Sequence, residues 1–171
     1  AAGARGRNEV VVIDVDNTLY PDSEAGIEAQ IVAGIHAFCA KNYNLTPAAC
    51  DELHHKHGST VQGIKKELGM TPEDEVLFYE EVYSDINYSS LLRLGSASAD
   101  GTGYKHGSSV RSLLSKTSSP VYIASNSPLK HVTRVLSALG LADFPLCGVM
   151  TPDTNNYLTK GDPQFWAPLL A

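Results

Sequence analysis

Two short apolar runs have the pattern of β-strands. Residues 10–13 (Val-Val-Val-Ile) are all β-branched, which predicts a strand buried on both faces in the middle of a parallel sheet. Residues 120–124 form a second β-rich run. The first run ends at Asp14 and the second at Ser125, so each strand is followed at once by a polar side chain. Open α/β sheets place their chemistry at the carboxyl ends of strands, which makes these two ends candidate site positions.

The stretch between the two runs has helical periodicity instead. Apolar residues recur at helical spacing from Ile27 to Phe38 and again around residues 46–58, 59–68 and 71–82. Thr71 suits an N-cap, and Pro72 suits the first helical position that follows it. About a hundred residues are far more than an ordinary connection needs, so the pattern predicts a small helical bundle inserted between the strands.

Helical periodicity returns around and after the second run. Apolar residues recur from Leu129 to Leu139, with Pro128 near the helix start and Gly140 at its end. A short helix at about residues 110–116 is expected to lead into the second strand, after a loop of small polar residues at 95–107. Strands alternating with helices predict an α/β fold.

Composition narrows the classes of function. At 171 residues, with 43% hydrophobic and 19% charged, the chain can bury one core and a small satellite. A net charge of −6 leaves no basic surface for duplex nucleic acid. No apolar stretch approaches the length of a membrane span, and residues 1–7 lack the hydrophobic region of a secretory signal. We therefore expect a cytoplasmic protein without a membrane partner.

Asp14 and Asp16 are the candidate catalytic pair. Side chains two positions apart in a strand point to the same side, so the two carboxylates could share a face. If the strand ends between them, one carboxylate could attack phosphorus while the other handles a proton. A carboxylate repels a phosphate dianion, so a hard cation such as Mg²⁺ would be needed between them. The alternative is structural, in which residues 16–18 (Asp-Asn-Thr) only supply turn and capping groups.

Residues 14–19 (Asp-Val-Asp-Asn-Thr-Leu) resemble the first motif of the haloacid dehalogenase-like (HAD) phosphohydrolase superfamily, and the following Tyr20-Pro21 resembles its pyrimidine 5′-nucleotidase branch. The resemblance implies a Rossmann-like parallel sheet with helices on both faces and an inserted helical cap. It also implies that Asp14 becomes transiently phosphorylated and that Asp16 acts as general acid and then base. Mg²⁺ would be held by the Asp14 side chain and the Asp16 backbone carbonyl, and Asn17 and Thr18 would help to bind phosphate.

Two further motifs resemble those of the same superfamily. Ser125 and Asn126 match its second motif, which implies that they hydrogen-bond the transferring phosphoryl group. Lys160 matches the cation of its third motif, although Gly161 stands where a proline is usual. Lys130, just after the second motif, is the competing cation. His131 matches a histidine that the nucleotidase branch commonly carries in this helix.

The resemblance also suggests the domain organisation. Residues 57–63 are similar to a cap segment of the nucleotidase branch, so residues 21–92 are expected to form the cap and residues 8–20 and 93–171 the core. The superfamily's fourth motif, an acidic pair that completes the Mg²⁺ shell, does not follow Lys160. We expect either a chain that continues beyond Ala171 or a protein that has lost part of its sheet and metal site.

The resemblance predicts a Mg²⁺-dependent phosphomonoester hydrolase, with a small phosphorylated substrate, a mononucleotide of the pyrimidine series. The alternatives are a HAD phosphatase for another small ester, or a catalytically silent phosphate-binding relative. Two further side chains stay ambiguous. Tyr20 could stack on a base or pack against the first cap helix, and His54 fits a solvated or substrate-facing cap surface better than a metal site.

Overall fold

The computed structural model describes residues 9–95 and 106–169 as a mixed α/β fold that is mostly helical. Its three strands are β1 (Val11–Ile13), β2 (Val121–Ala124) and β3 (Gly148–Met150). The helices, with two 3₁₀ segments η1 and η2, are α1 (Asp22–Ala25), α2 (Ile27–Tyr43), α3 (Pro47–His57), α4 (Thr60–Glu67), α5 (Pro72–Val82), α6 (Ser89–Gly95), α7 (His106–Leu114), α8 (Leu129–Ala138), η1 (Pro152–Thr154) and η2 (Pro163–Leu169).

The sheet is parallel, with the strand order β1-β2-β3. Ile13 pairs with Ile123, and Ile123 pairs with Val149. The prediction of a central first strand buried on both faces is wrong, because among the described residues β1 pairs only with β2 and Val12 keeps 37% of its surface exposed. The central strand is β2, in which three of four residues are buried.

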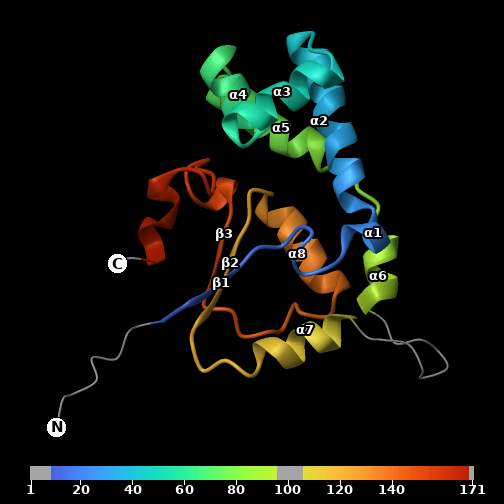
Figure 1. Cartoon of the computed structure of the whole chain (residues 1–171), viewed down its shortest axis with the longest axis vertical. Helices are drawn as coiled ribbons and strands as arrows, with labels where there is room; N and C mark the ends of the chain where they lie inside the picture. Colours follow the sequence, from blue (N-terminus) through green and yellow to red (C-terminus); the bar gives the residue numbers. More distant parts are fainter. Residues whose placement is uncertain (1–8, 96–105, 170–171) are drawn as a thin grey trace.

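Each face of the sheet contributes to a different hydrophobic cluster. Ile123 is buried in a cluster with Val132 and Val135 of α8, whereas the next residue, Ala124, is buried with Phe165 of η2. This alternation follows from the two-residue period of a strand. Figure 1 shows α8 (orange) on one side of the strands and the C-terminal segment (red) on the other.

Helices α2 to α5 form a bundle that lies apart from the sheet (Figure 1). The bundle has its own core, which includes Phe38, Ile64 and Phe78. The helices predicted for residues 46–58, 59–68 and 71–82 are confirmed as α3, α4 and α5. Thr71 caps α5 through a reciprocal capping box with Asp74.

The segment that enters the bundle consists of two helices that are separated at Gly26. Gly26 has a φ of 62°, so α1 ends there and α2 begins at Ile27. The Asp22 carboxylate accepts hydrogen bonds from the backbone N–H groups of Ile27 and Glu28, both at 2.8 Å, and thereby satisfies two free donors at the start of α2.

Helix α6 and strand β3 are among the elements that were not predicted. Helix α6 packs against α7 and α8, so residues 89–92, which we expected in the cap, lie beside the core. Most of the mobile loop expected at 95–107 falls outside the described residues. Among the helices of the described ranges, none has the length and apolar character required to cross a bilayer.

Gly34 allows α2 and α5 to approach closely, so we expect a side chain at this position to destabilise the protein. A Cβ at position 34 would stand 2.8 Å from the backbone oxygen of Val82, which cannot move without shifting α5. Gly34→Ala should therefore destabilise the protein by about 1–3 kcal/mol, although alanine normally favours a helix over glycine by about 1 kcal/mol. Denaturant unfolding measures the change. The exposed Ala40→Gly on the same helix serves as the control for propensity, and a gain in stability for Gly34→Ala would contradict the packing argument.

Candidate active site

The carboxyl ends of the three parallel strands gather polar residues at one edge of the sheet. Asp14 follows β1, Ser125 follows β2, and Thr151 follows β3. Lys160 reaches the same edge from the loop before η2. The structure therefore brings together the residues of the three sequence motifs, the first of which lies more than a hundred positions before the other two.

Asp14 forms an ion pair with Lys160. The Lys160 Nζ lies 2.7 Å from Asp14 Oδ1, and the same oxygen accepts a hydrogen bond of 2.8 Å from the Val15 backbone N–H. Within the described ranges no protein group bonds Asp14 Oδ2, and 40% of the Asp14 side chain is exposed. Asp14 therefore has one oxygen held in place and the other available to a ligand.

Lys160 is positioned by its main chain. Its backbone N–H donates to Asn126 Oδ1 at 2.8 Å, and its carbonyl oxygen accepts from Trp166 Nε1 at 3.1 Å. The first bond fastens the loop after β2 to the loop before η2, and the second ties that loop to η2. Lys160, and not the competing Lys130, is thus the cation that contacts Asp14; Lys130 is exposed on α8.

Asp16 has both carboxylate oxygens engaged. Oδ1 accepts from Tyr20 Oη at 2.6 Å and lies 2.7 Å from His131 Nε2, and Oδ2 accepts from Ser127 Oγ at 2.5 Å. Burial alone raises the pKa of Asp16, but the hydrogen bond and charge of His131, with the bonds from Ser127 and Tyr20, outweigh it and leave the pKa below its usual 3.8. In this arrangement Asp16 is an ionised base.

The groups around Asp16 are in turn bonded to residues that follow α5. Tyr83 Oη donates to Ser127 Oγ at 3.2 Å, and Tyr88 Oη lies 2.8 Å from His131 Nδ1. His131 is buried, with only 1% of its surface exposed. Two short chains of hydrogen bonds thus connect Asp16 with the segment that links the cap to the core.

The sequence did not single out Ser127, Tyr83 or Tyr88, and it identified His131 only by resemblance. The available signal was the position of His131 on the apolar face of its helix, in line with Val135 and Ala138, all of which are buried. A polar residue on such a face needs a hydrogen-bond partner. Nothing local indicated that the partner would be Asp16.

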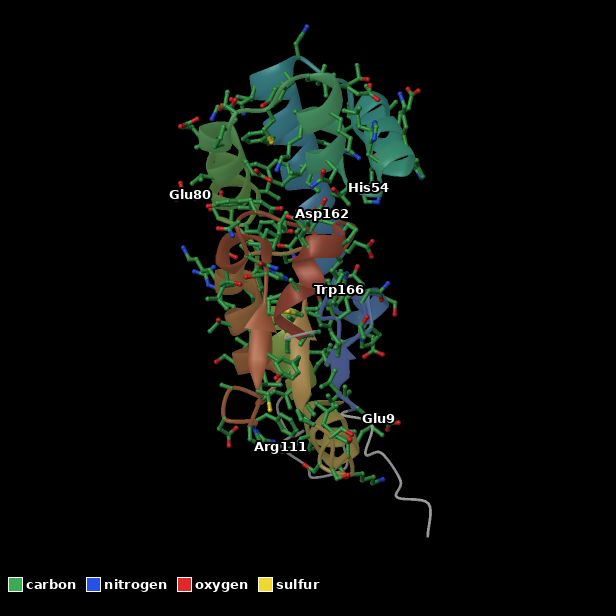
Figure 2. The ribbon with its side chains drawn as sticks, turned by 90° about the vertical axis from the view of Figure 1, so that its left-hand side faces the viewer. Glu9, His54, Glu80, Arg111, Asp162 and Trp166 are labelled. Carbon is green, nitrogen blue, oxygen red and sulfur yellow. The ribbon has the colours of Figure 1, made fainter. Side chains whose placement is uncertain are left out.

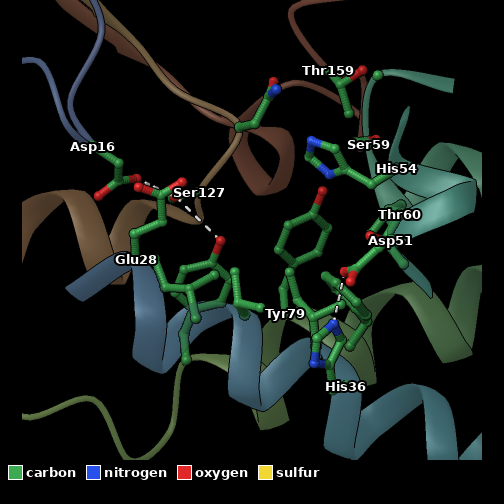
Figure 3. Close-up of a pocket in the computed structure, with 18 of the residues that line it drawn as sticks. Asp16, Glu28, His36, Asp51, His54, Ser59, Thr60, Tyr79, Ser127 and Thr159 are labelled. Carbon is green, nitrogen blue, oxygen red and sulfur yellow. Dashed lines mark hydrogen bonds and ion pairs between the residues drawn. The ribbon is translucent and has the colours of Figure 1, made fainter. Parts of the chain in front are cut away.

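A cavity of about 330 Å³ lies between the bundle and this edge of the sheet (Figure 3). Its polar floor comes from the core, and its walls come from the cap helices. The floor consists of Asp16, Asn17, Asn126, Ser127 and Thr159, and the apolar part of the wall includes Ile31, Val32, Ile35, Val61, Phe78, Tyr79 and Tyr83. Figure 3 shows the His54 ring directed into the cavity near Thr159.

The predicted phosphate-binding residues differ in their access to this cavity. Asn17 and Asn126 line it; Asn17 has a φ of 54°, a left-handed conformation that asparagine tolerates. Thr18 is exposed but is not among the lining residues. Ser125 is buried behind them, where its hydroxyl accepts from the Ser127 N–H at 3.0 Å. The phosphate-binding roles of Thr18 and Ser125 stay predictions.

The oxygen donors at the end of β1 are of the kind that Mg²⁺ prefers. Across residues 9–95 and 106–169, no three His, Cys, Asp or Glu side chains converge as a metal-ligand set. Mg²⁺ commonly keeps several waters and binds through one or two carboxylates. Asp14 Oδ2 and the Asp16 backbone carbonyl fit that more limited requirement.

The lowered pKa of Asp16 predicts a pH-dependent contribution to stability. Because the ionised form is favoured in the folded protein, its contribution is present above the ordinary pKa of 3.8 and is lost as the pH falls through the lower folded value. Asp16→Asn lacks this contribution at every pH. The wild-type advantage in unfolding free energy should therefore be largest near neutral pH and shrink below about pH 4. Urea unfolding of both proteins at a series of pH values measures this difference in unfolding free energy. A difference that grew on acidification would contradict a lowered pKa of Asp16.

The chain matches no model of a known protein family and no curated protein. The arrangement of its residues is therefore the basis for assigning a function. Three features of the site bear on its function. Asp14 is a partly exposed carboxylate beside Lys160, and Asp16 is a second carboxylate that is held ionised. A cavity under the helical bundle adjoins them.

Proposed function

We propose that this chain is a Mg²⁺-dependent phosphomonoester hydrolase of the HAD-like type, with Asp14 as its nucleophile. The observation that carries the proposal is the Asp14–Lys160 pair, in which Oδ1 is held by the cation and Oδ2 has no protein partner in the described part of the chain. A carboxylate oriented in this way can attack a phosphoryl group, and the lysine offsets the charge that gathers there.

The proposed reaction has two steps. Asp14 Oδ2 forms a bond to phosphorus while the bond to the ester oxygen breaks, and that oxygen leaves with a proton from Asp16. Water then attacks the aspartyl phosphate, Asp16 takes its proton, and Asp14 is released with inorganic phosphate. Mg²⁺, held by the Asp14 side chain and the Asp16 carbonyl, would neutralise charge on the phosphoryl oxygens.

Asp16 needs to change its partners during this cycle. Its lowered pKa suits the second step, in which it acts as a base. The first step requires a protonated Asp16, and its oxygens are engaged by His131, Ser127 and Tyr20. Movement of Tyr83 and Tyr88 with the cap is the route by which this network could loosen, since these tyrosines hold Ser127 and His131.

The fold and cavity support this proposal at two further points. A Rossmann-like core, with helices on both faces, is consistent with a parallel sheet that α8 covers on one side and η2 on the other. The cavity of about 330 Å³ is within the usual size range of small-ligand sites. We propose pyrimidine nucleoside 5′-monophosphates as substrates, as the sequence resemblance implies, in a cytoplasmic setting.

A second candidate is a catalytically silent phosphate-binding protein. It is favoured by the lack, within the described ranges, of a third acidic ligand beside Asp14 and Asp16. Such a protein would keep the Lys160 contact and the polar floor of the cavity, and would bind phosphate esters without turning them over.

Phosphate release from a panel of mononucleotides and sugar phosphates, with Mg²⁺ and with chelator, separates these candidates. Metal-dependent release that favours UMP or CMP supports the proposal in full. Release from other esters supports the mechanism with a different substrate. Binding of phosphate esters without any release would support the silent protein instead.

A further inference from the structure

A second cavity, of about 430 Å³, lies between α5 of the cap and α8 of the core. Further lining residues come from the segment after α5 and from the loop that contains η1. Tyr79 and Tyr83 line this cavity and also the active-site cavity, so their side chains lie between the two. Figure 2 shows Glu80, another lining residue, at the edge of the cap that faces the core.

The second cavity offers aromatic surface. Four tyrosines line it: Tyr79, Tyr83, Tyr88 and Tyr157. The ring of Tyr79 stacks on that of Tyr83 with centroids 6.4 Å apart, and its centroid lies 5.9 Å from that of Tyr157. Tyrosine provides a flat apolar face together with a hydroxyl group. Burial raises the pKa of Tyr83, so its hydroxyl stays a neutral donor.

The cavity also contains two positively charged side chains. Lys130 and Arg134 lie one turn apart on α8, and in the described parts of the chain neither has a carboxylate partner. Arg134 lies over the Tyr88 ring, 5.6 Å from its centroid. Two carboxylates line the cavity as well. Asp153 Oδ1 already accepts from Leu129 N and Thr151 Oγ1 at 2.9 and 2.7 Å. No group among the described residues bonds the Glu80 carboxylate, so it can accept from hydroxyl groups.

We propose that this second cavity binds a small aromatic anion of the nucleotide class. Its ring would lie against the tyrosines, its phosphate would lie between Lys130 and Arg134, and its sugar hydroxyls would donate to Glu80. Aromatic faces together with paired cations are the groups that recognise a base and a phosphate.

Binding at this second cavity acts on Asp16. Tyr88 and Tyr83 are lining residues that hold His131 and Ser127, and these two groups occupy both oxygens of Asp16. A ligand that immobilises the tyrosines stabilises the arrangement in which both Asp16 oxygens are engaged by protein groups, so it lowers turnover. Binding itself does not depend on the proposed hydrolysis; only this inhibition rests on it.

Calorimetric titration of the whole chain with AMP, in buffer with chelator, tests the proposal. AMP is chosen because the proposed substrates are pyrimidine nucleotides. Lys130→Gln with Arg134→Gln should weaken AMP binding at least about tenfold, as expected for the loss of charge-assisted hydrogen bonds. Lys66→Gln with Lys116→Gln makes the same change of charge at exposed positions elsewhere and should leave binding within about twofold.

Two further titrations decide whether the second cavity is the site. Asp14→Asn should leave AMP binding unchanged there, whereas binding in the active-site cavity would tighten as a negative charge is removed. Adenosine and inorganic phosphate should each bind at least about tenfold more weakly than AMP, because each lacks one of the two recognised parts. The proposal is overturned if AMP does not bind, if inorganic phosphate binds as well as AMP, or if binding responds to Asp14→Asn and not to the Lys130 and Arg134 changes. These titrations need no turnover, so they stand whether or not phosphate release is found.

Discussion

Asp14→Asn is expected to reduce phosphate release by at least about 10³-fold, because an amide oxygen is a far weaker nucleophile than a carboxylate. The substitution keeps the shape of the side chain and an oxygen that can still accept from the Val15 N–H. The lost ion pair with Lys160 is partly exposed, with 40% of the Asp14 side chain and 26% of the Lys160 side chain accessible. Its loss should therefore change the free energy of unfolding by no more than about 1 kcal/mol.

Steady-state phosphate release and denaturant unfolding measure these two effects separately. Mass spectrometry of acid-quenched protein adds a direct readout, since a phosphoryl adduct should form on the wild type and be absent from Asp14→Asn. Asp85→Asn, an exposed change of the same kind, is the matched control and should retain full activity. If Asp14→Asn kept near-normal turnover, Asp14 would not be the nucleophile and the proposed function would fall.

His131→Ala is expected to lower the free energy of unfolding by about 2–4 kcal/mol, through lost hydrogen bonds and a buried space. The imidazole connects Tyr88 Oη with Asp16 Oδ1 and is almost fully buried. Without it, a half-buried hydroxyl and a half-buried carboxylate each lose a partner. Activity should fall as well, by about 10²-fold, because Asp16 loses a group that holds it in place.

A pH profile separates this positioning role from a loss of stability alone. His131 lowers the pKa of Asp16, so its removal should raise that pKa. Because the first step needs protonated Asp16, the basic limb of the kcat/KM profile should move to higher pH. Thr133→Ala, an exposed change on the same helix, should move neither the profile nor the unfolding free energy. A His131→Ala protein with reduced stability but an unshifted basic limb would show that the histidine only supports the fold.

Helices with strong local signals could be predicted from the sequence, and elements with weak ones could not. Helix α5 was predicted because its cap residues and apolar periodicity agree. Strand β3 has three residues and α6 has seven, so neither is long enough for a periodic pattern to stand out. Strand β1 was identified as a strand but misplaced in the sheet, because a β-branched run has the same composition at an edge as in the centre.

The candidate site also has a part that could be predicted from the sequence and a part that could not. The sequence by itself determined which residues follow the strands, and hence that Asp14, Asp16 and the polar residues after β2 would face one edge of the sheet. Only the tertiary structure decided that Lys160 rather than Lys130 contacts Asp14, and that Asp16 is held by Ser127 and His131, 111 and 115 positions away. Hydrophobic period and capping act over a few residues, whereas an ion pair or a buried hydrogen bond depends on how whole elements pack. Contacts between distant segments are therefore not encoded in any local pattern.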